Sequence, residues 1–219
     1  MRPRAASVAL LALSLVGGCS SAGTAGARSA PAAAPSASRR ADTTALEQLP
    51  AGYGSLRQDD IAVKIQLPAL LVRATPLDES ILRVLSPDSY RALRDLREGK
   101  RADIDRSSSR QGVRNPSLWY VSFYGMQPDT PFSPQELVIS SGGRDYRPID
   151  VLPLSAGFNQ QRVGQREVQS AIYLFDDGVD PNQPLAITVQ GVQNASWRAQ
   201  LPVIERERAV IRTRAGKRP

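Results

Sequence analysis

The chain has 219 residues, with 28 Lys or Arg, 21 Asp or Glu and no His, which gives a formal net charge of +7. Without histidine the chain lacks the usual general base of Ser-His-Asp and Cys-His catalytic systems and the commonest transition-metal ligand. Its single cysteine leaves no disulfide within the chain, so the folded part must be held by its hydrophobic core.

The excess positive charge lies at the two ends of the sequence. Residues 53–210 contain 19 basic and 19 acidic side chains, whereas the residues before them carry a net +3 and those after them a net +4. A basic face of the kind that binds nucleic acid is therefore not expected on the folded domain. Basic ends beside a membrane would favour anionic lipid or wall polymers, or would only keep the chain in solution.

Residues 1–18 have the pattern of a secretory signal peptide. Arg2 and Arg4 form a short positive region, and a mostly apolar run without charged residues follows from Ala5 to Val16. A run of about a dozen residues is too short to cross the ~30 Å hydrocarbon layer as a helix, which takes ~20 residues. The pattern therefore indicates export rather than a transmembrane helix.

The segment Val16-Gly17-Gly18-Cys19 resembles the lipobox of bacterial lipoproteins, in which an aliphatic residue and two small residues precede a cysteine. The resemblance covers the first 19 residues, and Val16 stands where Leu is commonest. It implies that the Cys19 sulfur carries diacylglycerol and that the new amine is acylated after cleavage, for example by palmitate. Two or more acyl chains anchor a protein stably. A signal peptide with an unrelated cysteine is the alternative.

The resemblance also implies a location in the cell envelope, at the periplasmic or extracellular face of a membrane. Residues 19–52 then form a tether, because the segment is rich in Ala, Ser, Gly and Pro and poor in large apolar residues. Such a composition cannot offset the entropy cost of folding, so the segment is expected to be disordered. As a flexible coil, its roughly 30 residues span on the order of 30 Å.

Residues 53–211 are predicted to form one domain, because regular apolar patterns begin within this range. From Ile61 to Leu67 apolar and polar residues alternate, which is typical of a half-buried β-strand. Pro68 interrupts the pattern and cannot donate to a strand ladder, so residues 69–75 are expected to form an edge or bent strand.

A helical insertion is predicted at about 86–116. Ser86 followed by Pro87 is a typical helix start, and apolar residues then recur at helical spacing, which predicts a helix over 87–98. Residues 100–116 contain almost no apolar side chain, so a mobile loop is expected there.

The remaining predicted strands are separated by turn residues and recur about every ten residues. They lie at 118–125, 137–140, 146–152, 168–175, 185–189, 197–203 and 207–212. About seven to nine short strands without a βαβ rhythm indicate a mainly β domain. The predicted fold is an antiparallel Ig-like β-sandwich with one short helical insertion, followed by a basic tail at 212–219.

The most aromatic predicted strand carries the candidate ligand-binding residues, Tyr120 and Tyr124. They alternate with Trp119, Val121 and Phe123, so the two sets point to opposite faces of the sheet. The second set is the predicted core, and the two tyrosines can stack on sugar rings if their face is open. The alternative is that leucines of the inserted helix cover the tyrosines.

An acidic loop is a second candidate site. Asp176, Asp177, Asp180 and Asn182 follow a predicted strand and offer the oxygen ligands that suit Ca²⁺. Their spacing matches no calcium-loop motif, and the same residue types are common in tight turns. The sequence therefore assigns no metal site and no cofactor.

Catalytic motifs are weak in this sequence. It contains neither the GxSxG motif of serine hydrolases nor an SxxK motif. Paired carboxylates, as in glycosidases, stay an alternative, with Glu136, Asp145 and Asp150 in a region of predicted strands.

The predicted function is that of a membrane-anchored envelope lipoprotein with a non-enzymatic binding or structural domain. Its predicted partners are membrane lipid, through Cys19, and an envelope protein or wall polymer; no nucleic-acid partner is expected. The alternatives are a carbohydrate-binding module that uses Tyr120 and Tyr124, and a hydrolase that uses carboxylates.

Overall fold

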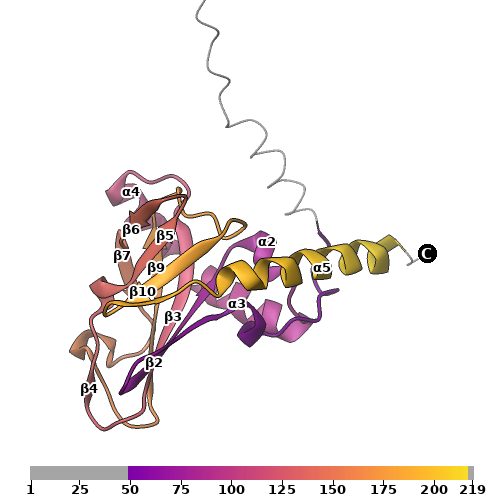
Figure 1. Ribbon diagram of the computed structural model, residues 1–219. Helices are drawn as coiled ribbons and strands as arrows, with labels where there is room; N and C mark the ends of the chain where they lie inside the picture. The colour runs from indigo at the N-terminus through magenta and orange to yellow at the C-terminus, as the bar shows by residue number, and fades with distance from the viewer. Residues whose placement is uncertain (1–48, 217–219) are drawn as a thin grey trace, which may run out of the picture. The chain divides into compact units, whose positions relative to one another are not determined.

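The computed structural model describes residues 49–216 (Figure 1). The predicted signal peptide, the lipobox with Cys19 and nearly all of the predicted tether lie outside these residues, as do the last three residues of the predicted basic tail.

Antiparallel β-sheets form the centre of the domain, and the mainly β class predicted from the sequence is confirmed. The larger sheet has the strand order β1-β2-β3-β9-β7, the second sheet has the order β11-β10-β5-β6, and β4 pairs with β8. The strands are β1 (Val63–Gln66), β2 (Leu70–Pro76), β3 (Ser117–Gly125), β4 (Thr130–Pro131), β5 (Val138–Ser141), β6 (Arg144–Tyr146), β7 (Asp150–Pro153), β8 (Arg162–Val163), β9 (Val168–Phe175), β10 (Leu185–Val189) and β11 (Val192–Asn194).

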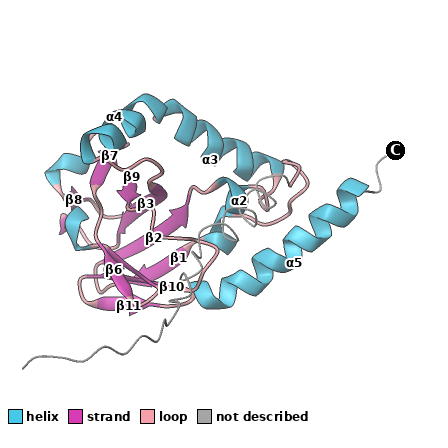
Figure 2. Ribbon diagram, turned by 90° about the horizontal axis from the view of Figure 1, so that it is seen from above, coloured by secondary structure: helices cyan, strands magenta, loops and turns pink. Residues whose placement is uncertain are grey.

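Helices lie on both sides of the larger sheet. Figure 2 shows α3 and α4 on one side of the strands and α5 on the other. The helices are η1 (Gln58–Ile61), α2 (Glu79–Leu82), α3 (Pro87–Gly99), α4 (Arg101–Gln111), η2 (Pro134–Glu136), η3 (Phe158–Gln160) and α5 (Trp197–Gly216). The predicted helix at 87–98 is confirmed as α3, with Pro87 at its first turn.

Strand β3 is the central strand of the larger sheet, and its two faces differ as predicted. Trp119, Val121 and Phe123 have no exposed surface. Their face packs against aromatic side chains from distant segments: the Phe123 and Phe132 rings stack with centroids 4.5 Å apart, and Trp119 meets Trp197 edge to face at 6.0 Å. Such aromatic contacts add to the free energy gained by burying apolar area.

The predicted mobile loop at 100–116 is wrong, because residues 101–111 form α4. Ile104 is the only large apolar side chain that this helix buries, and serines occupy its other buried positions. The Ser108 hydroxyl donates to the Ile104 carbonyl at 2.7 Å, and the Ser107 hydroxyl donates to Asp150 of β7. Hydrogen bonds of buried serines therefore replace most of the apolar contacts by which helices usually pack on a domain. For this reason the sequence lacks the apolar pattern that predicts a helix.

The predicted strands at 197–203 and 207–212 are also wrong, because one helix, α5, covers both. The alternation of apolar and polar residues up to Val203 imitates a strand, and Pro202 is a residue that helix interiors normally exclude. The buried positions of α5 recur at helical spacing, but one of them is occupied by Arg208. The sequence therefore does not show the continuous apolar stripe that is typical of a helix. Residues 212–216 continue this helix and are not a separate tail.

We predict that truncating Trp197 lowers the free energy of unfolding more than truncating an exposed residue of the same helix. Trp197→Ala removes a fully buried side chain whose ring N–H donates to the Pro181 carbonyl at 2.9 Å. It should lower the free energy of unfolding by about 3–5 kcal/mol. Val203→Ala, at a position 39% exposed, should change it by less than about 0.5 kcal/mol.

Urea unfolding followed by far-ultraviolet circular dichroism measures both variants. Equal midpoints for the two variants would mean that α5 does not pack on the sheet as described.

Candidate functional site

The outer face of β3 is open at one end of the larger sheet, and a groove of about 700 Å³ lies there. Its walls come from η1, three strands of the sheet, the first turn of α3 and the start of β9. The groove is lined by Arg57, Gln58, Asp59, Asp60, Lys64, Arg73, Ser89, Tyr120, Ser122 and Val168. These residues come from segments more than 100 positions apart, so only the folded chain assembles them.

Two basic side chains stand directly opposite each other in this groove. Lys64 of β1 and Arg73 of β2 are partners in the antiparallel register. Both contact the same carboxylate: Lys64 Nζ lies 3.2 Å from Asp59 Oδ2, and Arg73 Nη1 lies 3.1 Å from Asp59 Oδ1. All three side chains are about half exposed.

This arrangement is unfavourable for the sheet alone. Like charges directly opposite each other in neighbouring strands are destabilising, and a single exposed carboxylate offsets two cations only in part. Asp60 accepts a hydrogen bond from the Arg57 backbone N–H at 2.7 Å and does not contribute to this pair. The groove therefore keeps an excess of positive charge that is open to solvent.

The predicted residue Tyr120 lines the groove, and Tyr124 does not. Both point to the outer face of β3, about 14 Å apart along the strand, and both are partly exposed. Tyr120 is also packed against the core, whereas Tyr124 lies between Leu71 and Val168 on the neighbouring strands. Val168 is 49% exposed, so the face around Tyr124 is open.

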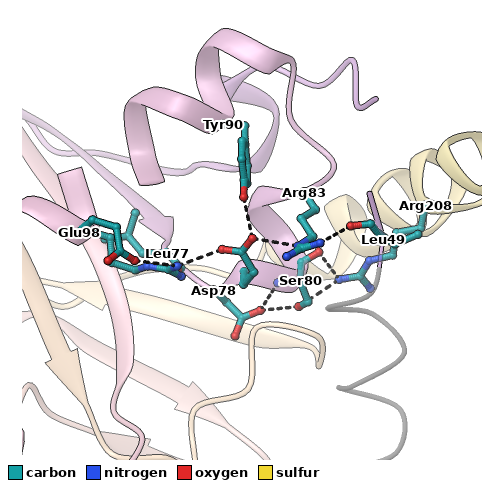
Figure 3. Close-up of polar contacts among 10 residues, drawn as sticks. Leu49, Leu77, Asp78, Ser80, Arg83, Tyr90, Glu98 and Arg208 are labelled. Atoms are coloured by element: carbon teal, nitrogen blue, oxygen red, sulfur yellow. Dashed lines mark hydrogen bonds and ion pairs between the residues drawn. The ribbon is translucent and has the colours of Figure 1, made fainter. Parts of the chain in front are cut away.

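A polar cluster around Glu79 ties α2 to α3 (Figure 3). The Glu79 carboxylate accepts hydrogen bonds from Arg83 at 2.9 Å, Arg97 at 3.0 Å and the Tyr90 hydroxyl at 2.8 Å. Burial of Glu79 opposes ionisation, but Tyr90 and the charges of Arg97 and Arg83 outweigh it, so the pKa of Glu79 lies below its ordinary value of 4.5. Burial and the bond to Glu79 raise the pKa of Tyr90.

A second groove, of about 430 Å³, lies beside this cluster. It is lined by three arginines and four acidic residues, which are Arg97, Arg101, Arg114, Asp78, Glu79, Glu98 and Asp105. Arg97 and Arg101 both pair with Glu98, so most of the charge in this groove is already neutralised. It is the weaker candidate for a binding site.

The acidic loop after β9 uses its side chains in turns. Asp176 accepts from the Gly178 backbone N–H, and Asp180 accepts from the backbone and side chain of Asn182. A hydrogen bond that the protonated Asp177 carboxyl donates to Asp176 raises the pKa of Asp177. Within residues 49–216 no group of three or more His, Cys, Asp or Glu is arranged to hold a metal ion.

The carboxylates considered for hydrolysis lie on separate elements. Glu136 ends η2, Asp145 of β6 accepts from Ser140 at 2.6 Å, and Asp150 of β7 accepts from α4. None of the three lines either groove.

No protein-family model, curated protein or solved structure matches the chain. In the described part of the chain, no helix has both the length and the apolar character needed to span a bilayer.

Sequence reasoning missed the pairing of Lys64 and Arg73 in the groove. The signal is nevertheless present, because both residues occupy solvent-facing positions of two strands that meet at the interruption around Pro68. A hairpin there sets Lys64 opposite Arg73. The third member, Asp59, precedes the first strand and is placed only by the fold.

We predict that Glu79→Gln destabilises the domain by about 1–3 kcal/mol at neutral pH, because two arginines lose their carboxylate. The pKa of Glu79 is lowered in the folded state, so its contribution is complete above the unfolded value of 4.5 and disappears as the pH falls through the folded value. The difference in unfolding free energy between the two proteins should therefore shrink below pH 4.5.

Urea unfolding at a series of pH values measures this difference. Glu98→Gln is the control, because Glu98 bridges Arg97 and Arg101 on the surface. A difference for Glu79→Gln that stays constant down to acid pH would contradict the assignment.

Proposed function

We propose that this protein is a lipid-anchored lipoprotein of the cell envelope whose folded domain is a non-enzymatic binding module. Cys19 carries the lipid, the Ala/Ser/Pro-rich segment tethers the domain, and the groove at Lys64 and Arg73 receives the partner. The partner is an envelope protein or a wall polymer.

The cross-strand pair of Lys64 and Arg73 is the observation that supports a binding site at this groove. Natural sequences tend to be locally consistent, and departures from that consistency concentrate at functional sites. Two opposed cations weaken the hairpin, and Asp59 balances them only in part. A negatively charged group of a partner would neutralise the remaining positive charge of Lys64 and Arg73.

The chemistry of the two cations favours a carboxylate or phosphate on the partner. The Arg73 guanidinium can donate two parallel hydrogen bonds to such a group, and Lys64 adds a second charge next to it. Asp59 lies on the short helix η1, outside the sheet, and competes with the partner for both cations.

A carbohydrate-binding module is the second candidate. Tyr120 lines the groove and Tyr124 lies on the same face of β3 beyond it, which favours a chain of sugar rings along this strand. The partial burial of Tyr120 limits the ring surface that it can offer.

A carboxylate-based hydrolase is supported less well. The two carboxylates of the larger groove are Asp59 and Asp60, and both are already engaged, by basic side chains and by the Arg57 backbone. A general acid needs a raised pKa, which nearby positive charge opposes.

For the fold we propose that the two larger sheets pack as a sandwich of the Ig-like kind. The position of β10 and β11 beside β1 supports this arrangement, as does the concentration of buried aromatic residues on one face of β3.

We predict that Cys19→Ala abolishes incorporation of a labelled fatty acid and releases the protein from membranes. The thiol is the only group of the lipobox-like segment that can carry diacylglycerol. Labelling of intact cells followed by membrane fractionation measures both effects. A variant that stays labelled and membrane-bound would overturn the proposed anchor.

We predict that Lys64→Gln combined with Arg73→Gln lowers recovery of the partner at least tenfold in an envelope cross-linking and pull-down experiment with the full chain. The domain should stay folded, because exposed ion pairs contribute only about 0–1 kcal/mol each.

The matched control is Arg144→Gln combined with Arg147→Gln, which removes the same charge from exposed residues at and just after β6. Unchanged recovery with the groove variant, or equal loss with the control, would exclude the groove as the binding site.

A further inference from the structure

Besides Arg214, which pairs with Glu207, helix α5 presents three exposed arginines, Arg198, Arg206 and Arg212. At 3.6 residues per turn they fall within about 120° of arc, and a rise of 1.5 Å per residue sets the first and last about 21 Å apart. In the part of the chain that the structure describes, no carboxylate forms an ion pair with any of them. Arg206 lies on the side of the helix opposite its buried stripe, and Arg198 and Arg212 lie between that side and the stripe.

The acidic residues of α5 do not neutralise this row. Glu205 pairs with the buried Arg208, and Glu207 pairs with Arg214 at 3.3 Å. Glu207 also accepts two hydrogen bonds from Ser55. Both glutamates therefore serve contacts within the domain, and the three exposed arginines remain positively charged and open to solvent.

Between these arginines lie the exposed Pro202 and Ala209, which are short or apolar, and Glu205, whose carboxylate pairs with the buried Arg208. Because Pro202 and Ala209 are short, the guanidinium groups of the three longer arginine side chains can contact one flat surface at the same time. A flat surface that carries negative charge fits this face of the helix.

The chain enters the described structure beside the same helix. The Tyr53 carbonyl accepts a hydrogen bond from Arg214 at 2.8 Å, and the Leu49 carbonyl accepts one from Arg83. Cys19 precedes Leu49 by 30 residues in the sequence, and Lys217 and Arg218 follow α5. A lipid on Cys19 would hold α5 within the reach of the tether, on the order of 30 Å.

We propose that the face of α5 formed by Arg198, Arg206 and Arg212 docks on anionic lipid headgroups of the membrane that holds the anchor. The planar guanidinium group matches phosphate oxygens in a two-pronged contact. The proximity of the membrane rests on the proposed anchor at Cys19, whereas the charge of the face does not. Lipid is favoured over a wall polymer because the tether keeps a bilayer within reach.

The test uses the chain from Ser20 to Pro219, which lacks the acylated cysteine and retains every core residue between Leu49 and Ile211. It is sedimented with vesicles of phosphatidylcholine alone or of phosphatidylcholine with phosphatidylglycerol. The native sequence should bind only the second kind, and added salt should weaken binding. Arg198→Gln, Arg206→Gln and Arg212→Gln together should weaken it on the order of 100-fold, about fivefold for each charge.

The control variant combines Arg144→Gln, Arg147→Gln and Arg166→Gln, which removes three exposed charges that have no ion-pair partner in the described structure. Its vesicle binding should change less than about threefold. Equal losses in the two triple variants would mean that net charge alone drives binding, and would overturn the proposal.

Two further outcomes would also overturn it. The native chain could fail to bind phosphatidylglycerol vesicles, or it could bind soluble dextran sulfate through the three α5 arginines while ignoring vesicles, which would assign the face to a polymer. Fatty-acid labelling of Cys19 is measured separately, so failure of this docking surface is distinguishable from failure of the anchor.

Discussion

The structure depends on a buried positive charge. Arg208 has no exposed surface, and a charge in the interior is tolerated only when it is paired and hydrogen-bonded. Its guanidinium donates to Asn182 Oδ1 at 2.7 Å, to the Ser80 carbonyl at 3.1 Å and to Glu205. These partners belong to the loop before β10, to α2 and to α5 itself. These contacts join α5 to both other segments, and Trp197 of the same helix packs against Trp119 in the core.

The candidate groove follows from how unevenly the helices cover the larger sheet. Helix α4 is fastened to β7 through Ser107 and Asp150, and α3 is fastened to α2 through Glu79. At the end of the sheet that carries Lys64 and Arg73, η1 and the first turn of α3 only border the groove, so both charges stay in contact with water. The core face of β3 contributes stability, whereas its outer face leaves room for a partner.

The sequence predicted much of the β-structure and little of the candidate site. The alternation in β3 predicted the buried face of Trp119 and Phe123, and the interruption at Pro68 separated β1 from β2. The groove could not be predicted from the sequence, because tertiary packing brings Asp59 to the Lys64–Arg73 pair. Tyr120 was found as a candidate because its position on the strand is a local property.

The sequence by itself determined the strands with clear alternation and the helix that begins at Pro87, and it carries the export-type pattern with its lipobox-like end on which the proposed anchor rests. Only the tertiary structure decided the conformation of residues 101–111 and 197–216. Local pattern shows the period of apolar residues, and in both helices polar side chains occupy buried positions. Ser107 and Arg208 are stable there because Asp150 and Asn182, distant in sequence, supply their hydrogen bonds, and no local pattern contains that information.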